Sequence, residues 1–171
     1  MKKIIAIFGS FCFLLLVSGC ATQGTLPTPT NYNKTRTYDV PFDSVWNAII
    51  GGIAEANLNI STLEKASGII AISDTTYPPS YAEEGTRGSK MGVPDQVLQR
   101  VAKLNIFATR ISDNKTTVRV NTSFHMQIRS GNGSEIFPYQ YTWVEAYSNG
   151  KIERKILDSI ATRTSSNQAS K

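Results

Sequence analysis

Apolar and polar residues alternate along residues 115–129, and this is the clearest pattern in the chain. In a strand, successive side chains point to opposite faces, so the apolar set falls on one side and the polar set on the other. The two sets are Val118, Val120, Thr122, Phe124, Met126 and Ile128 against Arg119, Asn121, Ser123, His125, Gln127 and Arg129. This pattern predicts a strand of an antiparallel sheet with one buried and one solvated face. A second strand is predicted over 101–112, with a tight turn at Asp113-Asn114 between the two.

Residues 42–58 have the period of a helix rather than of a strand. The apolar residues that share one helical face are Val45, Ile49 and Ile53. Pro41 suits the first turn, because its missing N–H would have no partner there. Gly51-Gly52 lies near the packed face, and we expect these glycines to permit close approach to a sheet; a hinge is the alternative.

Residues 148–163 form a second amphipathic segment. Its apolar residues repeat every four positions at Ile152, Ile156 and Ile160, with Leu157 alongside. Ser148 is the expected N-cap. Such a helix must lie on an apolar surface, and the buried face of the sheet is the natural partner.

Shorter strands are predicted over 36–40, 59–65 and 67–75, with Gly68 supplying the turn between the last two. The connection 75–100 is rich in proline and glycine, and a connection of this length is either functional or disordered. Odd positions of 137–143 are all aromatic, which suits a strand or the approach to a helix.

The order of strand, helix, several antiparallel strands and helix indicates an α+β layered fold. Its length suits a single domain over 36–163. Residues 20–35 are rich in Thr, Asn, Pro and Gly and read as a flexible tether, and 164–171 read as a disordered polar tail.

The chain begins with Lys2-Lys3 and an apolar run over 4–17. A spanning helix needs about 20 apolar residues, whereas the apolar region of a signal peptide needs about 7 to 15. We therefore predict a signal peptide over 1–19. The run Val17-Ser18-Gly19-Cys20 resembles the lipobox of bacterial lipoproteins.

The lipobox resemblance implies that Cys20 receives a diacylglycerol, that cleavage precedes it, and that its new amino group is acylated. Several acyl chains on one residue hold a protein firmly on a bilayer. Ala21, which is not acidic, implies the outer membrane by the sorting rule of two-membrane bacteria, and we expect the periplasmic side. The alternatives are an ordinary signal peptide cut elsewhere or a retained membrane helix.

Cys12 lies in the predicted signal peptide, so the mature chain would keep no cysteine but Cys20. This excludes a disulfide framework, a thiol catalyst and a cysteine metal site. The formal net charge is +5, and loss of Lys2 and Lys3 would lower it to +3. That excess falls short of the basic stripe typical of nucleic-acid binding, so we expect no nucleic-acid partner.

Residues 38–75 resemble the opening of small envelope lipoprotein domains related to BamC, in which a Val-Trp pair opens the first helix. Here this pair is Val45-Trp46, and Gly68-Ile69-Ile70 matches a glycine before an aliphatic strand. Residues 148–160 resemble the closing helix of these domains. The resemblance implies a helix-grip-like antiparallel sheet of about 4–5 strands, with one N-terminal and one long C-terminal helix on one face. It also implies a non-catalytic role in the cell envelope.

The candidate chemistry is sparse. His125 is the single histidine and falls on the solvated face, so neither a metal site nor a Ser-His-Asp triad is favoured. Glu83-Glu84 could be imagined as paired carboxylates, but a mobile connection fixes no separation between them. Arg87 and Lys90 could meet an anionic partner, although solvated charges are favoured. We predict no catalytic, cofactor-binding or metal-binding residues.

Aromatic residues could instead serve binding. Core packing or cover of a sheet edge is favoured over ligand stacking for the cluster Tyr139, Tyr141, Trp143 and Tyr147, and Trp46 is expected in the core or lining a groove. Two hypotheses of function follow. The first is a lipid-tethered interaction module that binds another envelope protein. The second is a binder of a small apolar or glycan ligand in the groove between closing helix and sheet, which a sizeable apolar cavity would favour.

Overall fold

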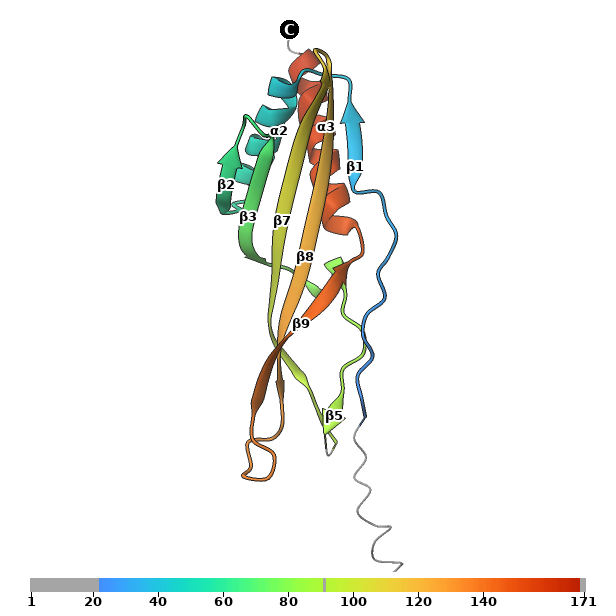
Figure 1. Ribbon diagram of the computed structural model, residues 1–171, viewed down its shortest axis with the longest axis vertical. Helices are drawn as coiled ribbons and strands as arrows, with labels where there is room; N and C mark the ends of the chain where they lie inside the picture. Colours follow the sequence, from blue (N-terminus) through green and yellow to red (C-terminus); the bar gives the residue numbers. More distant parts are fainter. Residues whose placement is uncertain (1–21, 91, 170–171) are drawn as a thin grey trace, which may run out of the picture.

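The computed structural model describes residues 22–90 and 92–169 of the 171-residue chain. Figure 1 shows a long, twisted sheet with two helices on one face. The helices are α2 (Phe42–Glu55) and α3 (Lys151–Ala169), with a short 3₁₀ turn η2 (Pro79–Tyr81). The strands are β1 (Thr35–Tyr38), β2 (Ile60–Glu64), β3 (Ile69–Thr76), β4 (Ala82–Glu83), β5 (Ser89–Lys90), β6 (Val93–Pro94), β7 (Gln96–Ser112), β8 (Lys115–Ser130) and β9 (Gln140–Ser148). The signal peptide predicted over 1–19 and the lipidation site Cys20 lie outside the described residues.

The main sheet has seven strands in the order β2-β3-β7-β8-β9-β4, and β1 also pairs with β8. All of these pairings are antiparallel. The predicted α+β fold with an antiparallel sheet is confirmed, but the prediction of about 4–5 strands is too low. One reason is that β8 is long enough for β1 and β9 to share one of its edges, β1 over Thr116–Arg119 and β9 over Phe124–Ser130. The other is that the two-residue β4 adds to the end of β9.

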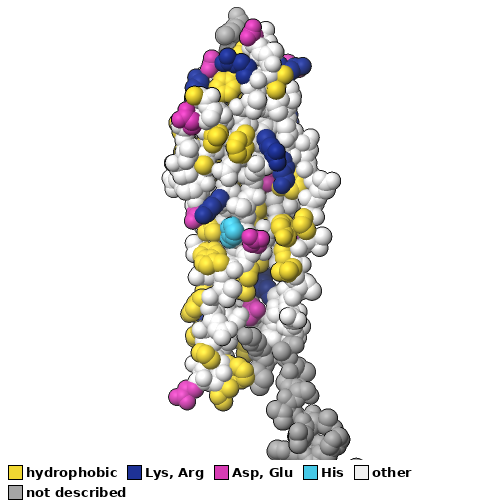
Figure 2. Space-filling view, viewed as in Figure 1, with side chains coloured by type: hydrophobic (Ala, Val, Ile, Leu, Met, Phe, Trp, Pro, Cys, Tyr) yellow, Lys and Arg dark blue, Asp and Glu magenta, His cyan; other side chains and the backbone are white. Residues whose placement is uncertain are grey.

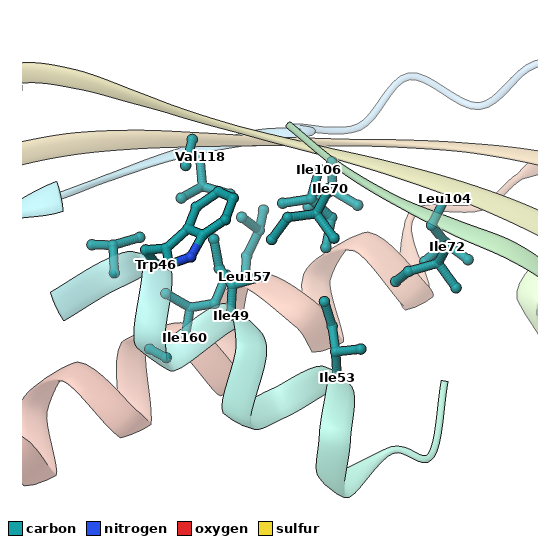
Figure 3. Packing of buried hydrophobic residues seen from close by; sticks show 14 of the residues in the cluster. Trp46, Ile49, Ile53, Ile70, Ile72, Leu104, Ile106, Val118, Leu157 and Ile160 are labelled. Carbon is teal, nitrogen blue, oxygen red and sulfur yellow. The ribbon is translucent and has the colours of Figure 1, made fainter. Parts of the chain in front are cut away.

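The alternation along β8 places its apolar side against the helices, as predicted. Val118, Val120, Phe124 and Met126 are buried. In Figure 3 the side chains of α2 and α3 point toward the apolar residues of β3, β7 and β8. The turn at Asp113-Asn114 lies between β7 and β8 as expected, and Gly68 adopts a φ of +70° in the turn before β3.

The glycine pair of α2 faces the other helix rather than the sheet. A Cβ on Gly52 would lie 3.3 Å from Oγ of Ser159, and one on Gly51 would lie 2.8 Å from a guanidinium nitrogen of Arg163. Arg163 in turn forms an ion pair with Glu55 at the end of α2. α2 and α3 pack side by side on the sheet, so these glycines permit close approach between the two helices. The prediction that they permit close approach to the sheet was wrong.

The closing helix begins later and ends later than predicted. Ser148 does not cap the first helical N–H groups directly; its Oγ accepts from the N–H of Gly150, while Oδ1 of Asn149 accepts from the N–H of Lys151. The helix then runs past residue 163 to Ala169, into the stretch for which the sequence predicted a disordered tail. Thr164 follows Ile160 by one helical turn, so it falls on the packed face and is buried.

Residues 22–34, predicted to form part of a flexible tether, lie extended along the domain (Figure 1). Thr22 and Ser89 exchange two backbone hydrogen bonds of 3.1 and 3.0 Å. Thr25 and Thr86 join the same two segments through their backbones and through hydroxyls 2.7 Å apart. The backbone groups of this N-terminal segment are therefore satisfied by hydrogen bonds to residues 86–89. These residues belong to the connection 75–100, for which the sequence predicted no helix or strand.

Candidate functional site

The exposed face of β9 carries a row of aromatic side chains, which we call the aromatic row: Tyr141, Trp143 and Tyr147. These side chains are 59, 50 and 37% exposed. Even-numbered neighbours such as Ala146 and Ser148 are buried, so the odd positions must point away from the helices. Core packing, one of the two favoured predictions, is therefore wrong for this cluster, while cover of a sheet edge stays a prediction. Trp46 is buried in the core as expected.

Polar side chains of β8 surround the aromatic row. The register places Trp143 opposite Gln127 and Tyr141 opposite Arg129. The guanidinium of Arg129 lies 4.6 Å from the ring centre of Tyr139, which begins the same run of aromatic residues at 45% exposure. Figure 2 shows this open face, with hydrophobic side chains spread along its length and most Lys and Arg side chains toward one end. An apolar strip with hydrogen-bonding groups at its rim is typical of a surface that binds another protein rather than of a catalytic site.

His125 lies on the open face, as predicted, opposite Glu145 in the register. Both line a hollow of about 220 Å³ between β9, β8 and the passing segment Pro29–Lys34. Within the described residues, no three side chains of His, Cys, Asp or Glu come together as a metal site would require.

A fully buried carboxylate lies beside this hollow. Glu153 in the first turn of α3 has no exposed surface, and it accepts hydrogen bonds of 2.7 Å from the hydroxyls of Tyr32 and Ser148. Burial, with the Glu153 carboxylate adding to it, raises the pKa of Tyr32 to about 12, so this hydroxyl stays a donor at neutral pH. The cluster fastens the N-terminal segment to the start of α3. The sequence alone gave no reason to pair residues so far apart.

A second candidate is a cavity of about 260 Å³ between α2, α3 and β3. Most of its walls are aliphatic, from Ile49, Ile53, Ile72, Ile106, Ile152, Ile156 and Ile160. Lys155 and Ser159 are the polar residues that α3 contributes to the lining. This is the groove between closing helix and sheet that the ligand hypothesis requires.

The connection 75–100 lines one side of the cavity through residues 75–78 and Tyr81, and an ion pair fixes it further along. The guanidinium of Arg100 binds the carboxylate of Glu84 through two hydrogen bonds of 2.5 and 2.9 Å, and the two side chains are only 20 and 11% exposed. The hydroxyl of Tyr77 is buried nearby and has no hydrogen-bond partner within the described structure, and burial raises its pKa to about 12.

The ion pair between Arg100 and Glu84 separates the two carboxylates, Glu83 and Glu84, that the sequence analysis considered as a pair. Glu84 is bound by Arg100, whereas Glu83 is exposed on β4, so the two do not act on a common point. Arg87 is exposed, and the side chain of Lys90 lies outside the described residues. Nothing in the sequence pattern pointed to Arg100, because it and Glu84 lie 16 residues apart in a connection with no periodic pattern.

No protein-family model and no curated protein matches the chain. The described helices include none that is long and apolar enough to cross a bilayer.

Proposed function

We propose that this chain is a non-catalytic interaction module, anchored to the outer membrane through lipid on Cys20 and facing the periplasm. In this proposal the aromatic row docks another protein of the cell envelope. The observation that carries it is the exposure of Tyr141, Trp143 and Tyr147 on one face of β9. Large aromatic side chains rarely gather on a surface without a binding role, and Trp and Tyr are over-represented among the residues that dominate protein interfaces.

The chemistry around the row supports a protein partner. Tyr and Trp give large contact areas with little loss of rotamer entropy, while their polar atoms can bond to a partner backbone. Gln127 and Arg129 supply the polar rim that surrounds a typical interface core. Truncating an aromatic hot spot at the centre of an interface costs about 2 kcal/mol or more, or roughly 30-fold in affinity.

Crosslinking in living cells, followed by identification of the crosslinked protein, tests the proposal. We expect one reproducible envelope partner with the natural chain and its loss with the double variant Tyr141→Ser, Trp143→Ser. Leu63→Ser is the matched control, because Leu63 is also about half exposed, at 52%, but lies on β2. A partner that survives the double variant, or that Leu63→Ser removes equally, contradicts a docking role for the aromatic row. Radiolabelled palmitate and the intact mass test the anchor separately.

The cavity supports a second candidate, a binder of a small apolar molecule. An empty apolar cavity of about 150 Å³ can already bind benzene, so about 260 Å³ has room for a larger ring or a short acyl chain. Lys155 would favour a ligand with an anionic end. Native mass spectrometry of the purified protein would show a bound mass that Ile156→Trp removes by filling the cavity. A bound mass that is unchanged in Ile156→Trp contradicts binding at this place.

A further inference from the structure

The first described residue is held at one end of the molecule. Thr22 is fixed to Ser89 by two backbone hydrogen bonds, and Thr25 is fixed to Thr86. The strand pair β5–β6, which begins at Ser89, lies at the same end of the long axis as the turn that joins β8 to β9 (Figure 1). We call this turn, residues 131–139, the hairpin tip.

The predicted lipidation site precedes Thr22 by only two residues. Two residues of extended chain span at most about 7 Å. Because Thr22 is bonded to the body, a bilayer that holds the lipid of Cys20 must lie close to this end, and the helices must lie away from it.

The hairpin tip is unusually apolar for an exposed turn. Ile136 is 80% exposed and Tyr139 is 45% exposed. Leu26, in the N-terminal segment close to Gly85, is 89% exposed, the highest value among the exposed large hydrophobic residues of the described chain. Most of the Lys and Arg side chains visible in Figure 2 lie toward the other end. Aliphatic residues flanked by Tyr and Trp are typical of segments that rest in the interface of a bilayer.

We propose that the hairpin tip is a second membrane contact, in which Ile136 enters the lipid interface while the molecule stands end-on above the bilayer. This inference rests on the proposed lipid anchor. Glu135, exposed beside Ile136, limits the contact to the headgroup region, since a carboxylate is costly deeper in the bilayer. Tyr139 stays with the tip, because its ring packs where a side chain on Gly133 would otherwise be.

The chain offers a clean fluorescence test, because it contains two tryptophans: Trp46, a buried residue of α2, and Trp143. In a Trp143→Phe background, Ile136→Trp adds one probe at the tip. Asn114→Trp adds the matched control at the β7–β8 turn, which lies at the opposite end (Figure 1). The intact lipoproteins are placed in phosphatidylethanolamine and phosphatidylglycerol vesicles, with and without brominated acyl chains.

Brominated acyl chains should quench the emission of Ile136→Trp strongly, and the lipid interface, brominated or not, should hold that emission at shorter wavelength than the emission of the exposed Asn114→Trp. The Asn114→Trp and shared Trp46 signals should not be quenched. Equal quenching of the two variants, or none for Ile136→Trp, in protein whose mass confirms acylation overturns the membrane contact and leaves the anchor standing. A mass without acyl chains overturns the anchor and this inference together.

Discussion

The hydrogen bond from the Tyr32 hydroxyl to the Glu153 carboxylate gives the most direct test of the structure. Tyr32→Phe removes one oxygen atom and leaves a fully buried carboxylate with Ser148 as its remaining side-chain donor. A hydrogen bond to a charged group contributes about 1.5–3 kcal/mol. Tyr32 is only partly buried, so water can replace some of what is lost. We therefore expect Tyr32→Phe to lower the free energy of unfolding by about 1.5 kcal/mol, at the low end of that range.

Urea unfolding measures this loss as a lower midpoint with an unchanged slope. For a chain of this size, about 1.5 kcal/mol corresponds to a fall of roughly 3–6 °C in melting temperature. Tyr141→Phe is the matched control, because its ring is 59% exposed, and it should stay within about 0.5 kcal/mol of the natural chain. The N-terminal segment should also exchange its amide hydrogens faster in Tyr32→Phe, since the bond fastens that segment to α3.

A double-mutant cycle decides whether the effect belongs to this bond. In a Glu153→Gln background the further change Tyr32→Phe should cost clearly less than it costs alone, because the charged acceptor is already gone. If Tyr32→Phe costs less than about 0.5 kcal/mol, or costs the same in both backgrounds, the hydrogen bond between Tyr32 and Glu153 does not fasten the N-terminal segment to α3.

Three further outcomes are expected. Gly68→Ala should prevent folding, because its Cβ would lie 1.9 Å from the carbonyl oxygen of Ala108, whereas Gly92→Ala, with a similar positive φ but open space, should cost only about 1–2 kcal/mol in thermal unfolding. Arg100→Met should lower the free energy of urea unfolding by about 2–3 kcal/mol, because it leaves the largely buried Glu84 carboxylate without its partner, and adding Glu84→Met should recover part of the loss. Burial raises the pKa of the hydroxyls of Tyr32, Tyr38 and Tyr77 from 10 to about 12. Stability should therefore fall as the pH rises from about 10 to about 12, because in this range the folded state holds protons that the unfolded state has released. Unfolding followed by circular dichroism would show this fall.

The long periodic segments could be predicted from the sequence, because their periods report directly on a buried face. Residues 115–129 became β8, and the helical spacing of Val45, Ile49 and Ile53 became the packed face of α2. A strand as short as β4 carries no measurable period, and the aromatic run 137–143 suited either a strand or the approach to a helix, so the width of the sheet could not be predicted.

Contacts between residues far apart in the sequence could not be predicted for a different reason. Alternation says which residues share a face of β9, but it does not say which of the two faces the helices cover. The same limit applies to Gly51 and Gly52, whose small size signalled a close approach without showing that α3 makes it. Arg100 with Glu84, and Tyr32 with Glu153, are joined only by the three-dimensional path of the chain.

The two proposals constrain each other through the length of β9. Side chains along a strand advance about 3.3 Å per residue, so Tyr147 lies roughly 25 Å beyond Tyr139. With the hairpin tip in the headgroups, the aromatic row runs from just above the bilayer to about that height. A partner that covers the whole row must then itself be close to the membrane, as an outer-membrane protein or another anchored lipoprotein is. The helices, held at the far end, would remain free of that contact, which separates the surface that docks from the core that keeps the sheet in shape.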